Sequence, residues 1–320
     1  MINLESKQLR ATYGEALVEL GAANGRVVVV DADMAEGTMT GGFKDHFPER
    51  FFDVGVAEQN LMGVGAGLSV AGWIPFVNTF AWLLVLRAGD PLRTLVSYAR
   101  TNVKIVASYG GFSGPMDGAT HQAIMDLAVV RALPNMTVVV ASDHYQVRSL
   151  LPLVADLDGP VYLRLSRAEV VDVHEENTRF EIGKATPLKT GGEVTLITHG
   201  PILGRVLTAA SIWADREIPA SVLEVHTLKP LDGEAILAEA ARTRAVVTVE
   251  EHNIIGGLGS AVSELLSENL PTPLRRIGIR DCYGETGPYE KLLDLYGMGV
   301  QDIVAAAEEV LRRRGSTLSR

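Results

Sequence analysis

The chain has 320 residues, more than the roughly 100–200 of one typical domain, so two domains are expected. Hydrophobic residues make up 47% and charged residues 21%, which is enough to bury a sizeable core and argues against a disordered chain. The net charge of -10 argues against nucleic acid and anionic membranes as partners, because both bind basic patches. A single cysteine, Cys282, excludes an intramolecular disulfide, and the sequence shows neither a signal-like start nor a membrane-length apolar run, so we expect a cytoplasmic protein.

The first part of the chain alternates short apolar runs with helical segments. Strands are predicted at 27–31, 74–78, 103–108, 137–141 and 161–165, and helices at 9–24, 58–71, 80–99, 121–133 and 143–156. Most of these strands are hydrophobic on both faces, which is typical of a parallel sheet covered by helices on both sides. We therefore predict a first α/β domain over residues 1–172.

A second series of the same kind follows a polar segment. Residues 173–192 are rich in charged side chains, end in two glycines, and are predicted to be a linker. Strands are then predicted at 194–198, 221–225, 245–250 and 274–278, and helices at 202–216, 233–241, 259–269 and 300–313. The predicted fold class is α/β with two domains, the second over 193–320, each a mainly parallel sheet flanked by helices.

A predicted strand leads directly into a helix at the sequence Gly-Val-Ala-Glu-Gln-Asn, residues 55–60. Glu58 falls in the first helical turn, where the helix dipole favours a carboxylate, so a purely structural acid is one interpretation. The helix also contains Gly63, Gly65 and Gly67, although each glycine inside a helix costs about 1 kcal/mol relative to alanine. We therefore expect another backbone or a flat ligand to approach this helix closely.

The sequence around Glu58, with the glycine-rich helix and the Gly-Trp-Ile-Pro-Phe-Val that follows it, resembles the pyrimidine-binding domain of transketolase and of 1-deoxyxylulose-5-phosphate synthase. In that family the matching glutamate hydrogen-bonds N1′ of the thiamine diphosphate pyrimidine. The resemblance implies that Glu58 is catalytic, because it stabilises the imino tautomer that activates the cofactor. It also implies that Phe80 stacks on the pyrimidine and that Leu83, where relatives carry an aromatic residue, belongs to the cofactor site.

Residues 117–122 read Asp-Gly-Ala-Thr-His-Gln and lie between a glycine-rich loop and a predicted helix. A helix cap followed by a surface histidine is the structural interpretation. The segment resembles the Asp-Gly-Pro-Thr-His-Gln of transketolase, which implies that Asp117 and His121 contact sugar hydroxyls and that His121 takes part in catalysis. We favour this interpretation because ligands of open α/β sheets bind at the carboxyl ends of the strands.

Two arginines resemble phosphate ligands of the family: Arg10, in Arg-Ala-Thr, and Arg167, in Leu-Ser-Arg. Arginine suits an anionic group because its planar fork donates paired hydrogen bonds, although an exposed arginine can equally be solvated. Tyr109 stands where transketolase has a phosphate-contacting histidine. This replacement predicts a preference for a different sugar, such as a branched, deoxy or sulfonated one.

The second domain resembles the C-terminal domain of transketolases and 2-oxoacid dehydrogenases, which mainly builds the dimer. Its Gly-Gly-Leu-Gly-Ser, residues 256–260, precedes a helix and could cradle a phosphate. We predict no catalytic residue in this domain, and we expect His199 and His226 to be structural.

Transketolase is about twice as long, and its first half holds the diphosphate and Mg²⁺ through a Gly-Asp-Gly … Asn motif that this sequence lacks. The resemblance therefore implies the C-terminal subunit of a split transketolase, with no metal ligand of its own. An N-terminal partner subunit would supply the diphosphate and Mg²⁺ site, and two copies of each would form an α2β2 heterotetramer. The implied reaction moves a two-carbon ketol unit from a phosphorylated or otherwise anionic ketose to an aldose.

Three alternatives stay open. The first is a 1-deoxyxylulose-5-phosphate synthase-like activity that uses pyruvate. The second is the β subunit of a 2-oxoacid dehydrogenase, although that group usually carries other residues around the glutamate. The third, from another class, is a non-catalytic structural or regulatory subunit that has kept the fold.

Overall fold

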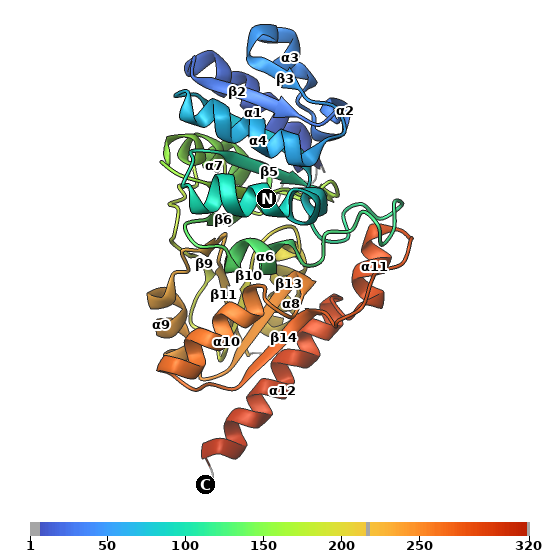
Figure 1. Cartoon of the computed structure of the whole chain (residues 1–320). Coiled ribbons are helices and arrows are strands. Elements are labelled where there is room, and N and C mark those ends of the chain that lie inside the picture. Colours follow the sequence, from blue (N-terminus) through green and yellow to red (C-terminus); the bar gives the residue numbers. More distant parts are fainter. Residues whose placement is uncertain (1–6, 216–217, 319–320) are drawn as a thin grey trace.

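A computed structural model describes residues 7–215 and 218–318 (Figure 1). The first unit runs from β1 to β8 and contains a seven-stranded sheet, to which the second unit contributes one strand, β12. The second unit runs from β9 to α12 and contains a five-stranded sheet. Helices flank both sheets, so the predicted α/β fold class is confirmed. Within the two described ranges, no helix is both long and apolar enough to cross a bilayer.

The first sheet has the strand order β12-β6-β7-β5-β4-β2-β3. Its strands are β2 (Val27–Asp31), β3 (Phe51–Asp53), β4 (Ile74–Phe80), β5 (Lys104–Ser108), β6 (Thr137–Val140), β7 (Val161–Arg164) and β12 (Thr227–Lys229). All neighbours are parallel except β12, which comes from the second unit and pairs antiparallel with β6. The carboxyl ends of the six parallel strands therefore open at one edge of the sheet.

The helices of the first unit cover this sheet. They are α1 (Leu9–Ala23), α2 (Ala35–Thr38), α3 (Gly41–His46), η1 (Pro48–Arg50), α4 (Glu58–Val70), η2 (Leu83–Arg87), α5 (Gly89–Pro91), η3 (Leu92–Tyr98), α6 (Asp126–Ala132) and α7 (His144–Asp156). A short antiparallel pair, β1 (Lys7–Gln8) with β8 (Glu169–Val170), completes the unit. The helices predicted at 9–24, 58–71 and 143–156 agree with α1, α4 and α7 to within one residue at each end.

Two predicted helices differ from the structure. The segment expected as one helix at 80–99 begins with the last residue of β4 and then divides into η2, α5 and η3, of which η2 and η3 are π-helical. Pro91 lies at this division, and proline cannot donate a main-chain hydrogen bond. The helix expected at 121–133 begins only at Asp126, because His121 N and Gln122 N both donate to Gly118 O in a turn.

The close approach expected at the glycine-rich helix α4 is made by the sheet beneath it. A side-chain carbon on Gly65 would lie 2.5 Å from Val77 Cγ2, a contact that no real side chain tolerates. Gly65 therefore lets α4 pack tightly on β4, and this glycine has a structural rather than a ligand-binding explanation.

The second sheet has the order β14-β13-β10-β11-β9. Its strands are β9 (Thr186–Lys189), β10 (Val194–Thr198), β11 (Ala220–Glu224), β13 (Val246–Asn253) and β14 (Leu274–Ile279). The helices are α8 (Leu203–Asp215), α9 (Gly233–Thr243), α10 (Leu258–Asn269), α11 (Tyr289–Leu295) and α12 (Val300–Leu318). The edge strand β9 lies inside residues 173–192 and pairs antiparallel with β11.

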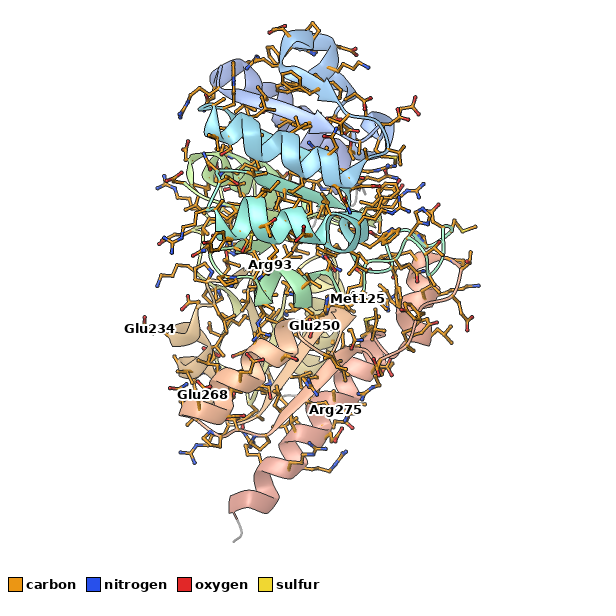
Figure 2. The ribbon with its side chains drawn as sticks, viewed as in Figure 1. Arg93, Met125, Glu234, Glu250, Glu268 and Arg275 are labelled. Atoms are coloured by element: carbon orange, nitrogen blue, oxygen red, sulfur yellow. The ribbon has the colours of Figure 1, made fainter. Side chains whose placement is uncertain are left out.

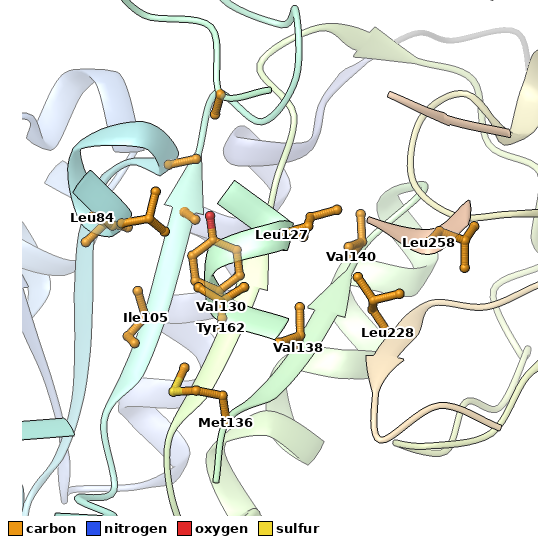
Figure 3. Close-up of a cluster of buried hydrophobic side chains, with 14 of the residues drawn as sticks. Leu84, Ile105, Leu127, Val130, Met136, Val138, Val140, Tyr162, Leu228 and Leu258 are labelled. Atoms are coloured by element: carbon orange, nitrogen blue, oxygen red, sulfur yellow. The ribbon is translucent and has the colours of Figure 1, made fainter. Parts of the chain in front are cut away.

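The two units share one apolar core. Figure 3 shows Ile105 and Tyr162 from the first sheet in the same cluster as Leu228, on β12, and Leu258, at the start of α10. All four side chains are buried. Because β12 pairs with β6 and Leu258 of α10 lies in the shared cluster, the position of the second unit is fixed relative to the edge where the parallel strands end.

A buried histidine also connects the units. His174 Nδ1 lies 2.8 Å from Asp143 Oδ2, at the start of α7, and His174 Nε2 lies 2.9 Å from Glu224 Oε2, at the end of β11. The second contact is an ion pair outside hydrogen-bond geometry. Burial alone would lower the pKa of His174, but the two carboxylates outweigh it and raise that pKa to about 10.

We predict a pH-dependent contribution of His174 to stability. Protonated His174 stabilises the fold fully below its unfolded pKa of about 6.5, and this stabilisation is lost as the pH rises through about 10. His174→Gln should therefore lower the free energy of unfolding by at least about 2 kcal/mol at pH 6.5, and by progressively less toward pH 10. Urea unfolding followed by circular dichroism measures the difference at each pH.

The control is His46→Gln, because His46 lies exposed on α3 and its loss should cost little at any pH. If the cost of His174→Gln is the same at pH 6.5 and pH 10, the ion pairs do not contribute as described.

Candidate functional site

The residues predicted to bind cofactor and substrate gather at the carboxyl edge of the first sheet. Phe80 is the last residue of β4 and pairs in register with Ser108, the last residue of β5, so Tyr109 follows directly beside it. Arg167 lies just beyond the end of β7, and Arg10 lies in the first turn of α1. The structure thus brings together side chains that lie more than 150 positions apart in the sequence.

Aromatic rings form the centre of this group. The rings of Phe80 and Tyr109 are 4.0 Å apart between centroids, and Leu83 packs in the same cluster. His121 meets Phe80 edge-on at 5.9 Å. Phe80, Leu83 and Tyr109 are each no more than 8% exposed, so Tyr109 covers much of the Phe80 ring.

Tyr109 lies between the two predicted anion ligands. Arg10 Nη1 donates to Tyr109 Oη at 3.1 Å, and the Arg167 guanidinium lies 4.9 Å from the centre of the Tyr109 ring. Tyr109 has a φ of 64°, which is strained for a bulky residue and persists only where the surroundings enforce it. Arg167 Nη1 also donates to Asp117 Oδ2 at 3.0 Å, whereas Arg10 donates to neutral oxygens of Gln8, Gly37 and Tyr109.

The position of Arg10 depends on a buried carboxylate that sequence reasoning missed. Asp31, at the end of β2, accepts hydrogen bonds from Met34 N and from the hydroxyls of Thr38 and Thr40. Burial raises the pKa of Asp31, and these donors oppose the rise. They fix the turn containing α2, whose Gly37 O accepts from Arg10 Nη1 at 2.7 Å. The sequence did contain a signal for this residue, because Asp31 is the one polar residue of β2 and stands at its carboxyl end.

Glu58 lies apart from the aromatic cluster, at the first turn of α4. It is 4% exposed, and its Oε1 lies 3.5 Å from Arg87 Nη1, at the end of η2. The side chain of Arg87 is 54% exposed. Both residues line an open hollow of about 430 Å³ together with Ala57, Gln59 and Asn60.

Arg87 and Trp82 connect Glu58 to the aromatic cluster, and sequence reasoning missed both contacts. The Arg87 guanidinium lies 5.5 Å from the Trp82 ring, and that ring lies 6.4 Å from His121. Trp82 Nε1 is buried and finds no hydrogen-bond partner in the described part of the chain. Its place just after the end of β4 could have marked Trp82 as a site residue.

The glycine-rich loop at 256–260 does not offer a phosphate cradle. Leu258 N and Gly259 N, at the start of α10, already donate to the carboxylate of Glu250 at 2.7 and 2.8 Å. Figure 2 labels Glu250 near the boundary between the units. A side-chain carbon on Gly257 would lie 2.0 Å from Glu250 Oε2, so this glycine admits the protein's own carboxylate.

A larger hollow of about 530 Å³ lies elsewhere, between β8, α8 and α11, and is lined mainly by apolar side chains such as Val170, Leu207 and Leu293. Among residues 7–215 and 218–318, no three histidine, cysteine, aspartate or glutamate side chains are placed to hold a metal ion.

Comparison with known families matches both units. Residues 5–171 match the family described as "Transketolase, pyrimidine binding domain", and residues 183–303 match "Transketolase, C-terminal domain". Among solved structures, the chain superposes on one described as "Split gene transketolase, inactive beta4 tetramer" with a TM-score of 0.89 and 46% identity, covering 95% of this chain and 98% of that one. Transketolase from Leishmania mexicana shares the fold, with a TM-score of 0.83 and 21% identity over 98% of this chain and 47% of that one.

Curated relatives of similar length include a 6-deoxy-6-sulfo-D-fructose transketolase subunit of Clostridium sp. (strain MSTE9), 43% identical over 98% of this chain and 97% of the relative. A putative transketolase C-terminal section of Methanocaldococcus jannaschii is 41% identical over 96% and 97%. The 1-deoxy-D-xylulose-5-phosphate synthase of Desulforudis audaxviator is 36% identical, and the chain spans only 48% of its length. The chain therefore belongs to the transketolase family, as the C-terminal half that split-gene members carry on a subunit of its own.

Proposed function

We propose that this chain is the catalytic C-terminal subunit of a thiamine-diphosphate-dependent transketolase, which moves a two-carbon ketol unit from an anionic ketose to an aldose. The observation that carries the proposal is the buried Glu58 carboxyl at the start of α4, beside an open hollow and connected through Arg87 and Trp82 to an arginine-rich sugar site. Membership of the transketolase family supports transferase chemistry in general.

The residues at the sheet edge fit the cofactor. A carboxyl that is 4% exposed and borders a hollow suits a hydrogen bond to a ring nitrogen, so Glu58 would share a proton with the pyrimidine N1′. Phe80 and Leu83 would contact the ring, although Tyr109 already covers one side of Phe80. When bound, thiamine diphosphate supplies the electron sink for carbon–carbon bond cleavage.

Arg87 gives Glu58 a counter-charge in the isolated chain. Because the Arg87 side chain is half exposed, its ion pair with Glu58 contributes little stability and is easily exchanged for another contact. With the cofactor bound, Glu58 would exchange its contact with Arg87 for the hydrogen bond to the pyrimidine nitrogen. His121 and Asp117 would then orient the sugar hydroxyls from the opposite side of the cluster.

The proposal assigns the diphosphate and Mg²⁺ to an N-terminal partner subunit, in an α2β2 assembly. The relatives of similar length are described as a subunit and as a C-terminal section, whereas the synthase relative is about twice as long. The solved relative described as an inactive beta4 tetramer supports the expectation that C-terminal subunits alone associate without activity.

The sugar would carry an anionic group bound by Arg10 and Arg167. Two relatives are described by their sugars: one as acting on 6-deoxy-6-sulfo-D-fructose, and one, a subunit from Phocaeicola vulgatus that is 36% identical, on apulose-4-phosphate. Both sugars are anionic. Tyr109, held by both arginines, distinguishes this site from the histidine-bearing site expected of common sugar phosphates.

A 1-deoxyxylulose-5-phosphate synthase-like activity is the second candidate, favoured by the 36% identity over 306 residues to that enzyme. It ranks lower because the split relatives are more similar and match in length. Replacing the ketose donor by pyruvate in the assay below distinguishes the two activities.

We predict that Glu58→Gln abolishes ketol transfer. The amide cannot share a proton with N1′ in the same way, so kcat/KM should fall by at least about 100-fold. The measurement uses this chain reconstituted with its N-terminal partner subunit, thiamine diphosphate and Mg²⁺, and a panel of phosphorylated, sulfonated and uncharged ketoses.

The matched control is Glu49→Gln, an exposed acid in η1, which should leave transfer unchanged. Full activity of Glu58→Gln would refute the catalytic assignment. Turnover by this chain without its partner would refute the split site, and a reconstituted wild type that transfers nothing would favour a structural or regulatory subunit.

We predict that Tyr109→Phe weakens binding of the anionic donor. The change removes one of the acceptors that hold the Arg10 guanidinium, while the hydrogen bonds to Gly37 O and Gln8 Oε1 remain. One net hydrogen bond is worth about 0.5–1.5 kcal/mol, so KM should rise about 3- to 10-fold for anionic ketoses and remain unchanged for uncharged ones. Tyr145→Phe, on α7, is the control. An equal rise for both kinds of donor would show that Tyr109 does not act through the anion site.

A further inference from the structure

The loop between β5 and α6, residues 109–125, carries Tyr109, Asp117 and His121, and it leaves its own sheet to lie against the second unit. Figure 1 shows this loop beside the segment that contains α11. Phe112 and Ile124, near the two ends of the loop, are buried in the apolar core of the second unit. The Phe112 ring lies 4.8 Å from that of Tyr296.

Polar contacts fix the same loop between these two anchors. Gln122 Nε2 donates to Glu285 O at 3.0 Å, and Gly287 N donates to Pro115 O at 3.2 Å. The segment before α11 therefore holds the part of the loop on which Asp117 and His121 lie.

Glu251, on β13, makes the shortest of these attachments. Its Oε1 accepts from Phe112 N at 2.6 Å, and its Oε2 accepts from Tyr289 Oη, on α11, at 2.6 Å. The side chain is 2% exposed, so both oxygens are used away from water. A buried carboxylate that satisfies a loop N–H fixes the backbone there, because losing it leaves that donor unpaired.

The contact between Glu251 and Phe112 N requires a glycine at position 111. It has a φ of 62°, and a side-chain carbon built on it would lie 2.3 Å from Glu251 Oε1. Only glycine allows the carboxylate to reach the neighbouring Phe112 N in this conformation.

We propose that Glu251 is a positioning residue for the sugar site: with Tyr289 it holds the 109–125 loop so that Asp117 and His121 face the substrate, which gives the second unit a direct part in substrate binding. The proposal rests on the transketolase function proposed above. It differs from the expectation that this unit mainly builds the dimer, because it makes sugar affinity depend on a residue of β13.

The neighbouring Glu250 offers a matched control. It is buried on the same strand, and its carboxylate likewise accepts two hydrogen bonds, but both come from backbone N–H groups of α10, those of Leu258 and Gly259, rather than from the loop. Glu250→Gln and Glu251→Gln each replace a charged acceptor by a neutral amide and so weaken the hydrogen bonds that the carboxylate accepts, and only the second affects the 109–125 loop.

The experiment compares Glu251→Gln, Tyr289→Phe and Glu250→Gln in the chain reconstituted with its partner. We expect Glu251→Gln to raise KM for the ketose about 5- to 10-fold, and Tyr289→Phe to raise it less, with kcat and the thiamine diphosphate concentration for half-activation unchanged. Amide hydrogen exchange of residues 109–125 should accelerate in both variants. Glu250→Gln should lower Tm without changing KM or exchange in the loop.

A normal KM in Glu251→Gln, or an equal rise in Glu250→Gln, would overturn the positioning role. Tyr289→Phe keeps the proposal testable if Glu251→Gln does not fold, because the ring and its packing remain. A wild-type assembly that transfers no ketol unit would instead overturn the proposed function, and loop exchange, which needs no turnover, would then still decide whether Glu251 fixes the loop.

Discussion

The guanidinium of Arg164, a residue that is only 3% exposed, connects the edge of the first sheet, the 109–125 loop and the second unit. It donates through Nε and Nη2 to Asp126 at 2.8 and 3.0 Å, through Nη2 to Ala123 O, and through both terminal nitrogens to Glu251 O. A buried charge is tolerated only when paired and fully hydrogen-bonded, so these partners must keep their places. The backbone of the 109–125 loop also packs closely against Arg164, because a side-chain carbon on Gly110 would lie 2.6 Å from Arg164 Nε.

The two ends of the candidate site therefore differ in how firmly they are held. The end at Tyr109 is held rigidly, because Gly110 and Gly111 are packed against Arg164 and Glu251 and so enforce the strained φ of Tyr109. The end at Glu58 is open, since Glu58 lines a hollow and its ion-pair partner Arg87 is half exposed. Under the proposed function, the chain alone presents a formed sugar site, whereas the environment of Glu58 is completed by what the partner and cofactor bring.

The sequence predicts features that depend on neighbouring residues, and it does not predict contacts between residues far apart in the chain. Strands at 27–31 and 194–198 were predicted residue for residue because an apolar run on both faces is a local signal. The pairing of β12 with β6 and the contact of Glu251 with Phe112, 139 positions away, have no such signal. In the site, family resemblance singled out Arg10, Tyr109 and Arg167 separately, and only the structure shows that one tyrosine ring joins them.

In the second unit, backbone donors of the kind that bind anions are already occupied by the protein's own carboxylates. Its two buried glutamates on β13, Glu250 and Glu251, have pKa values that burial raises to about 7, yet both accept backbone N–H groups. Those donors, at a helix start and in a glycine-rich loop, are of the type that binds phosphate in other folds. Because the chain's own carboxylates occupy them, the anionic sugar of the proposed function would depend on the guanidinium groups of Arg10 and Arg167 at the sheet edge.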